Sequence, residues 1–135
     1  MRATLVARET IGYIWPQVEQ YILKAFDVPC DEPAESVIKD LETGDAHLWV
    51  AHDARGIKGA AIARRILLIN GRQIYQVIAC GGEEMPTWVS SGLKSIERFA
   101  KDNDCSAVRL SDRPGWKFLE RSGYKEPFCI LEKAL

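Results

Sequence analysis

The sequence has no apolar run long enough to cross a membrane. The longest run, around residues 57–69, is interrupted by Lys58, Arg64 and Arg65, whereas a spanning helix needs about 20 consecutive apolar residues. The first residues, MRATLVARET, are too short and too charged for a secretory signal. We therefore expect a cytoplasmic protein with no membrane partner.

An excess of charge of one sign is also missing. Lys and Arg number 18 and Asp and Glu number 19, which gives a formal net charge of −1. Such a chain has no long-range attraction for the phosphates of a nucleic acid or for an anionic membrane surface. No nucleic-acid-reading motif is present either, so the sequence disfavours nucleic acid as a partner.

Clustered metal ligands are absent as well. The four cysteines form no Cys-x-x-Cys pair, which predicts reduced thiols; they are Cys30, Cys80, Cys105 and Cys129. His47 and His52 flank one expected strand at a spacing that sends them to opposite faces, so they cannot share a metal ion. The sequence therefore predicts no metal site.

What remains is the pattern of an ordinary globular chain, whose 135 residues suit a single domain. Pro16 is expected in the first turn of a helix, Gly44 and Gly123 at helix ends, and Asn70-Gly71 in a two-residue hairpin turn. The patterns predict strands over residues 3–8, 46–52, 57–69, 72–80, 107–110 and 124–131, and helices over residues 16–26, 33–42, 88–101 and 114–121. This order predicts an α+β fold, with a mixed, mainly antiparallel sheet and helices on both faces.

The same order resembles that of the GNAT superfamily of N-acyltransferases over nearly the whole chain. The segment SDRPGWKFLERSGYKE is similar to the family's helix that ends in a Gly-aromatic pair, here Gly123-Tyr124. The segment HLWVAHDARGIKGAAIARRI resembles a strand pair of the family. More narrowly, the Trp-Pro start and the TGDAHLWV and DRPGW blocks resemble short GNAT-like proteins of phages and prophages.

The resemblance implies acyl transfer from acyl-CoA, such as acetyl-CoA, to an amine acceptor. Glu83 or Glu84 would then remove a proton from the amine, and Tyr124 would return one to the leaving thiolate. Backbone N–H groups of the fourth strand would hold the pantetheine and polarise the thioester carbonyl. The residues implied at that strand are Ile78, Ala79, Cys80, Gly81 and Gly82.

The sequence departs from the family pattern at two points. The diphosphate loop of the family reads Q/R-x-x-G-x-G/A, but here Glu83, Glu84, Met85, Pro86 and Thr87 precede the helix. Pro86 lacks an N–H group, and two carboxylates would repel a diphosphate by about 1 kcal/mol each. Leu119 stands where family members commonly carry the Tyr that returns a proton to the leaving thiolate. These departures keep open a second interpretation, a catalytically inactive GNAT-fold protein that binds a partner, such as a phage structural protein in a virion.

The candidate residues also have plainer interpretations. Gly81-Gly82 could simply close a strand, and Glu83-Glu84 could be an acidic cap before a helix. Cys80 fits a buried structural thiol, Tyr124 a packed side chain, and Trp49 a core residue. A basic stripe beside Trp116 could bind a partner or form a solvated helix face; its members are Arg113, Lys117 and Arg121.

Overall fold

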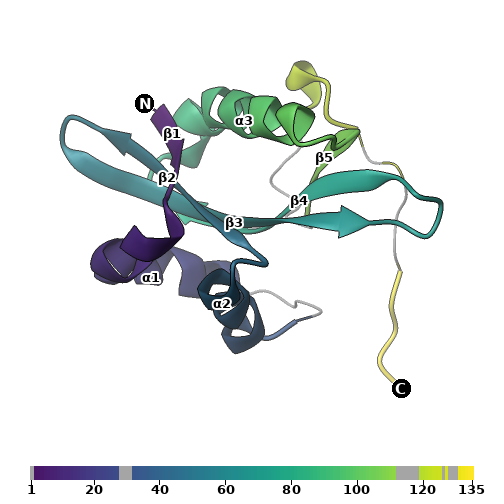
Figure 1. Ribbon diagram of the computed structural model, residues 1–135, viewed down its shortest axis with the longest axis horizontal. Helices are drawn as coiled ribbons and strands as arrows, with labels where there is room; N and C mark the ends of the chain where they lie inside the picture. Colours follow the sequence, from purple (N-terminus) through teal and green to yellow (C-terminus); the bar gives the residue numbers. More distant parts are fainter. Residues whose placement is uncertain (1, 28–31, 112–118, 126, 128–130) are drawn as a thin grey trace.

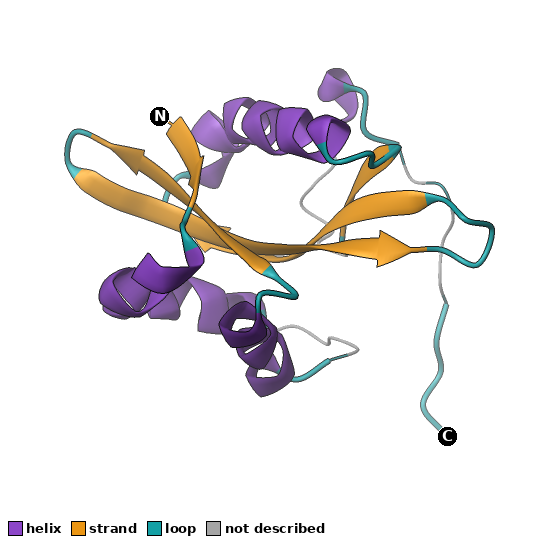
Figure 2. Cartoon of the chain, viewed as in Figure 1, coloured by secondary structure: helices purple, strands orange, loops and turns teal. Residues whose placement is uncertain are grey.

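The computed structural model describes residues 2–27, 32–111, 119–125, 127 and 131–135. A twisted sheet forms the middle layer, with α1 (Ile11–Ala25) and α2 (Ala34–Thr43) on one face and α3 (Met85–Asp102) on the other (Figure 1). Figure 2 shows the same three layers with helices and strands in separate colours. The predicted α+β class, a mixed sheet with helices on both faces, is confirmed.

The described part of the sheet has five strands in the spatial order β1-β2-β3-β4-β5. The first four are antiparallel neighbours, and β5 alone runs parallel to β4. The strands are β1 (Arg2–Leu5), β2 (His47–Asp53), β3 (Gly56–Leu67), β4 (Gln73–Gly82) and β5 (Ala107–Leu110). A parallel neighbour requires a crossover, which α3 provides.

The helices differ from the sequence predictions mainly at their starts. A short 3₁₀ turn, η1 (Arg8–Thr10), leads into α1, which begins at Ile11, so Pro16 lies inside the helix rather than in its first turn. A proline inside a helix removes one bond and crowds the carbonyl four residues earlier; that residue is the exposed Gly12. α2 ends at Gly44 with φ of 87°, as predicted.

The hairpin between β3 and β4 forms as predicted, but its turn is of another type. Leu68 N–H donates to the carbonyl of Arg72 at 2.7 Å, and Gly71 N–H donates to the carbonyl of Leu68 at 2.9 Å. Only Gly71 has a positive φ, 86°, in this loop. A three-residue loop with glycine in the left-handed position replaces the two-residue turn, and the Asn70 side chain accepts the N–H of Arg72 at 3.0 Å.

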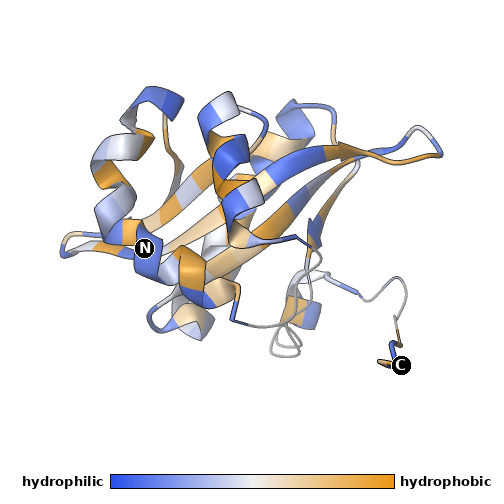
Figure 3. Cartoon of the chain, turned by 90° about the horizontal axis from the view of Figure 1, so that it is seen from below, coloured by the Kyte–Doolittle hydropathy of each residue, from blue (hydrophilic) through white to orange (hydrophobic). Residues whose placement is uncertain are grey.

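Each face of the sheet has its own hydrophobic core. Figure 3 shows blue and orange segments alternating along the helices, as expected where one helix face is buried. The α1/α2 core contains Val18, Ile22, Val37, Leu41, Ala46, Leu48, Val50, Ala60 and Ile62. The α3 core contains Trp49, Ala51, Ala61, Ala63, Tyr75, Val77, Trp88, Val89, Leu93, Ile96, Ala100 and Leu119. The prediction that Trp49 packs in the core is confirmed.

The last predicted strand is wrong wherever the structure describes it. Residues 124, 125, 127 and 131 are not in strand conformation, and Pro127 has no N–H to give to a ladder. Most of the predicted helix over residues 114–121 lies outside the described residues, but residues 119–122 form a 3₁₀ turn. Gly123 ends that turn with φ of 91°, as predicted.

Candidate functional site

Gly81 and Gly82 lie at the end of β4, where chain segments approach from both faces. A Cβ on Gly81 would lie 2.3 Å from the carbonyl oxygen of Tyr21 in α1. A Cβ on Gly82 would lie 2.9 Å from the Trp88 indole, on the opposite face. Gly59 of β3 is confined by the same indole, at 2.6 Å. The glycine pair thus lets α1 and Trp88 pack directly on the strand end.

β4 extends well beyond its partner β5. The parallel ladder runs only from Ile74 with Ala107 to Val77 with Leu110, and Ser111 N–H adds one bond to the carbonyl of Val77 at 3.1 Å. Residues 79–82 continue to pair with β3 on the other side. Among the described residues, no strand pairs with the β5-facing edge of this last part, and we call the region where β4 and β5 diverge the fork.

A bulge at Ile78 determines which groups face this fork. Ala63 of β3 pairs with Val77 and Ile62 pairs with Ala79, so Ile78 is the extra residue. Beyond the bulge, Glu83 N–H donates to the carbonyl of Lys58 in β3 at 2.8 Å. Because successive N–H groups point to opposite edges of a strand, those of Cys80 and Gly82 point into the fork. Of the predicted cofactor-binding residues, these two carry their N–H groups on the fork side of β4.

The Glu83 carboxylate turns toward β3 and α1. It lies 3.7 Å from Lys58 Nζ and accepts a long hydrogen bond of 3.4 Å from the Tyr21 hydroxyl. Burial, followed by the charge of Glu83, raises the pKa of Tyr21. The Glu83 side chain is 59% exposed, so it stays accessible to a ligand or to water.

The turn that should cradle a diphosphate offers few donors. Glu84 adopts the left-handed conformation, with φ of 52°, immediately before α3. Pro86 has no N–H, and Thr87 donates both its N–H and its hydroxyl to the carbonyl of Glu84, at 3.0 and 2.7 Å. Helix N-termini bind anions through free N–H groups, so this turn is poorly equipped for the task.

Tyr124 is held against α3, away from solvent. Its hydroxyl donates to the Glu97 carboxylate at 2.8 Å. Burial, together with this bond and the charge of Glu97, raises the pKa of Tyr124 far above its ordinary value. Nearby, Ser122 bonds Ser90 at 2.9 Å and Leu119 is fully buried. This contact supports the packed interpretation of Tyr124, which is a weak acid in this setting.

The predicted partner-binding stripe falls largely outside the described residues. Arg113, Trp116 and Lys117 lie there, as do Cys30 and Cys129. Arg121 is exposed, in the turn that precedes Gly123.

Sequence reasoning missed an aromatic network on the α3 face. The buried Tyr75 hydroxyl accepts the indole N–H of Trp49 at 2.9 Å and lies 2.8 Å from Nδ1 of His47. Phe99 of α3 packs against all three rings. Burial raises the pKa of Tyr75 to about 12, and burial with the nearby Arg65 lowers that of His47. The Nδ1 atom of a neutral His47 can accept a hydrogen bond from the Tyr75 hydroxyl. The network depends on how β2, β3 and β4 align, and this register is not known from the sequence, so no sequence signal indicated it.

No cluster of three potential metal-ligating side chains occurs within the described part of the chain. His52 lies on the face opposite His47 and contacts the Thr4 hydroxyl at 2.8 Å. None of the described helices is long and apolar enough to span a membrane.

Solved structures of several acetyltransferases superimpose on this chain over nearly its whole length. An N-acetyltransferase of ribosomal-protein alanine from Brucella melitensis superimposes with a TM-score of 0.67 at 14% identity, covering 98% of this chain and 99% of that one. A GNAT family acetyltransferase from Staphylococcus aureus gives 0.66 at 15% identity, covering 98% and 97%. An aminoglycoside acetyltransferase from a soil metagenome, solved with sisomicin, gives 0.68 at 11% identity, covering 98% and 95%.

No protein-family model and no curated protein sequence matches the chain. The structural likeness extends over nearly the whole of each chain, and it defines the fold. The chain has the GNAT acetyltransferase fold, as the sequence pattern predicted.

Proposed function

We propose that this protein is an acyl-CoA-dependent N-acyltransferase that holds its donor mainly at the end of β4, beyond its pairing with β5, and only weakly through the diphosphate turn. The observation that carries the proposal is the fork: β4 runs to Gly82, while β5 pairs with it only as far as Val77. An extended pantetheine arm can add to such an edge as a further strand would, by backbone hydrogen bonds.

The chain's own groups suit the chemistry of acyl transfer. The N–H group of Gly82 can donate to the thioester carbonyl and stabilise the oxyanion that forms when the amine attacks. The exposed carboxylate of Glu83 or Glu84 can take the amine proton, directly or through water. The C–N bond then forms as the C–S bond breaks. Because Tyr124 is bound to Glu97, we assign protonation of the leaving thiolate to solvent.

Weak diphosphate binding follows from the turn that precedes α3. We expect acetyl-CoA to bind weakly in calorimetric titration at low salt. Its affinity should not decrease as salt is added, because salt screens a repulsion here rather than an attraction. Micromolar affinity that falls steeply with salt would contradict this expectation and would indicate a conventional cationic cradle.

Charge reversal at the turn provides a sharper test. The double variant Glu83→Lys with Glu84→Lys should bind acetyl-CoA up to about a thousandfold more tightly, since two repulsions of about 1 kcal/mol become attractions of similar size. A matched double reversal on α2, Glu35→Lys with Glu42→Lys, changes the net charge equally at exposed positions of another element. Equal gains in both variants would mean that the turn does not contact the diphosphate.

A second candidate is a catalytically silent GNAT-fold protein that binds a partner, in line with the narrower resemblance to phage and prophage proteins. The observation that favours it is the fully buried Leu119 with Tyr124 held by Glu97, which leaves no hydroxyl acid in the described C-terminal turn. Turnover of acyl-CoA with a panel of amines would exclude it. Stable recovery with capsid or tail proteins from infected cells, with no turnover, would support it.

A further inference from the structure

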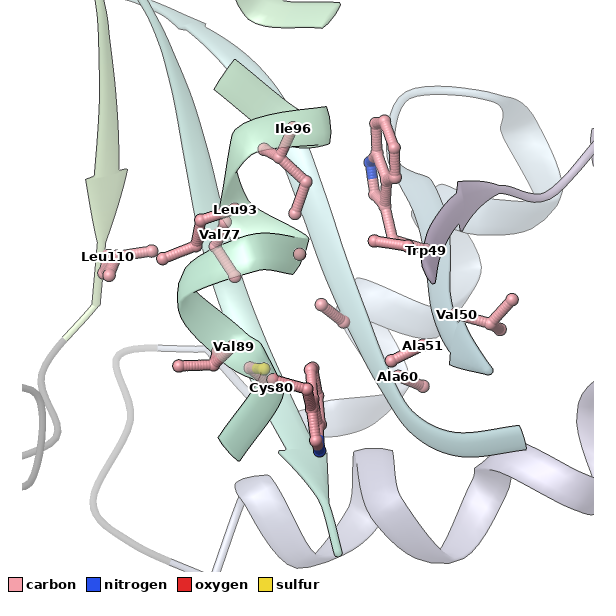
Figure 4. A pocket seen from close by; sticks show the side chains of 14 residues that line it. Trp49, Val50, Ala51, Ala60, Val77, Cys80, Val89, Leu93, Ile96 and Leu110 are labelled. Carbon is pink, nitrogen blue, oxygen red and sulfur yellow. The ribbon is translucent and has the colours of Figure 1, made fainter. Parts of the chain in front are cut away.

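An apolar cavity lies between α3 and the sheet, beside the fork. Figure 4 shows its lining side chains converging from α3, from the strands and from β5. The cavity has a volume of about 30 Å³, which is room for about two water-sized groups. It exists because small side chains meet there from three strands and the helix: Ala3, Ala51, Ala61 and Gly92.

The chemistry of the walls selects an apolar occupant. Among the described residues, the walls expose no polar atom to the space. An ordered water needs two to four polar partners, and cavities without them stay dry or take up apolar molecules. An amine acceptor or a charged group would be left without hydrogen bonds here, so neither is a suitable ligand.

The position of the cavity links it to the fork. Val77 and Leu110 form the last pair of the β4–β5 ladder, and both line the cavity. Cys80, whose N–H points into the fork, also lines it. An acyl group whose thioester carbonyl lies on the β4 edge would therefore have this apolar space within reach of its far end.

We propose that the cavity receives the tail of the donor's acyl group, so that the preferred donor is a short acyl-CoA longer than acetyl-CoA, such as propionyl- or butyryl-CoA. This inference rests on the proposed function. Helix α3 covers the space and Trp49 bounds it, which excludes long fatty acyl chains. Burial of the acyl chain would offset the weak hold of the turn on the diphosphate.

Titration with free CoA and with its acetyl, propionyl and butyryl thioesters tests the inference directly. We expect affinity to rise about fourfold with each methylene that enters the cavity, and to fall for a long fatty acyl thioester. If all the thioesters bind with the same affinity as free CoA, the acyl pocket is wrong while the proposed function stands. If neither CoA nor any thioester binds, the proposed function fails and this inference fails with it.

A variant at Gly92 tests whether the cavity binds the acyl tail or is only an unoccupied packing defect. A Cβ at Gly92 would lie 3.5 Å from that of Ala3 and 3.7 Å from the Trp88 ring, in ordinary contact. Gly92→Ala should therefore fold normally, narrow the cavity and reduce the preference for butyryl- over acetyl-CoA about fourfold. Gly12→Ala, the same change in α1 with nothing within 4 Å, should leave the preference unchanged. An unaltered preference in Gly92→Ala would overturn the inference.

Discussion

In its first half, β4 lies between β3 and β5, under aromatic rings. In its last half it pairs, within the described part of the chain, with β3 alone, and small residues lie on both faces. The first half is closed. The Tyr75 hydroxyl accepts the indole N–H of Trp49 and lies beside the His47 ring, and Phe99 packs against all three rings. The last half, the open end, is rich in glycine and alanine, and no described strand lies beside its β5-facing edge. One strand thus combines a rigid anchor with an accessible site, and the two halves should respond differently to mutation.

The largest expected effect is at the glycine that α1 touches. Gly81→Ala would place a methyl group 2.3 Å from the Tyr21 carbonyl, which neither backbone can avoid without moving. We expect a loss of about 3 kcal/mol of unfolding free energy, measured by urea denaturation. Gly12→Ala is the control: it adds a methyl group to open space in a helix and should stabilise the protein by about 0.5–1 kcal/mol. A neutral Gly81→Ala would mean that α1 does not pack on the strand end.

The next effect is at the closed half. Tyr75→Phe leaves the buried indole N–H of Trp49 without its acceptor, which should cost about 2 kcal/mol of unfolding free energy. Tyr13→Phe is the matched control, because the Tyr13 side chain is 85% exposed. Equal stability of the two variants would show that the Tyr75 hydroxyl forms no net favourable bond.

A smaller effect concerns pH. Burial and Arg65 lower the pKa of His47 in the folded state, so the unfolded state binds the proton more readily. Stability should be complete above the unfolded pKa of about 6.5 and should fall as the pH drops through it. His47→Gln should flatten this part of the stability curve. A curve that does not change in His47→Gln would contradict the assignment.

The smallest effect is at the open end. Glu83→Gln removes an ion pair with Lys58 whose side chains are 30% and 59% exposed. Thermal and urea unfolding should shift by less than about 0.5 kcal/mol, because exposed pairs contribute little. A loss comparable to that of Tyr75→Phe would mean that the open end is part of the stabilising framework.

The sequence predicted those elements that local signals determine. Gly44, Gly123 and the period of α3 defined helix ends and faces, and the strand order carried the fold. The predicted helix start at Pro16 was wrong. A proline usually lies in the first turn of a helix, but here the exposed turn at Gly12 accommodates it inside α1. The predicted last strand rested on its apolar residues and on the Gly123-Tyr124 pair of the resemblance, with Pro127 interpreted as a bulge or an edge position.

The candidate site was less predictable. The sequence showed a glycine pair and an acidic turn, but the contacts of Gly81 with α1 and of Gly82 with Trp88 depend on the bulge at Ile78. The network of His47 and Tyr75 joins residues on two strands with β3 between them. Such contacts require the register, which no local pattern specifies.

The extra residue at Ile78 exchanges odd and even positions along β4. Before it, odd-numbered residues such as Tyr75 and Val77 face α3; after it, even-numbered residues such as Cys80 do. Removing Ile78 itself would join Val77 to Ala79 in a regular ladder, because their partners Ala63 and Ile62 are already adjacent in β3. Every following side chain would then keep its layer, with Gly81 beneath α1 and Gly82 beneath the indole ring. A deletion of one residue in this strand should therefore be made at Ile78, the position that can lose a residue without changing the register.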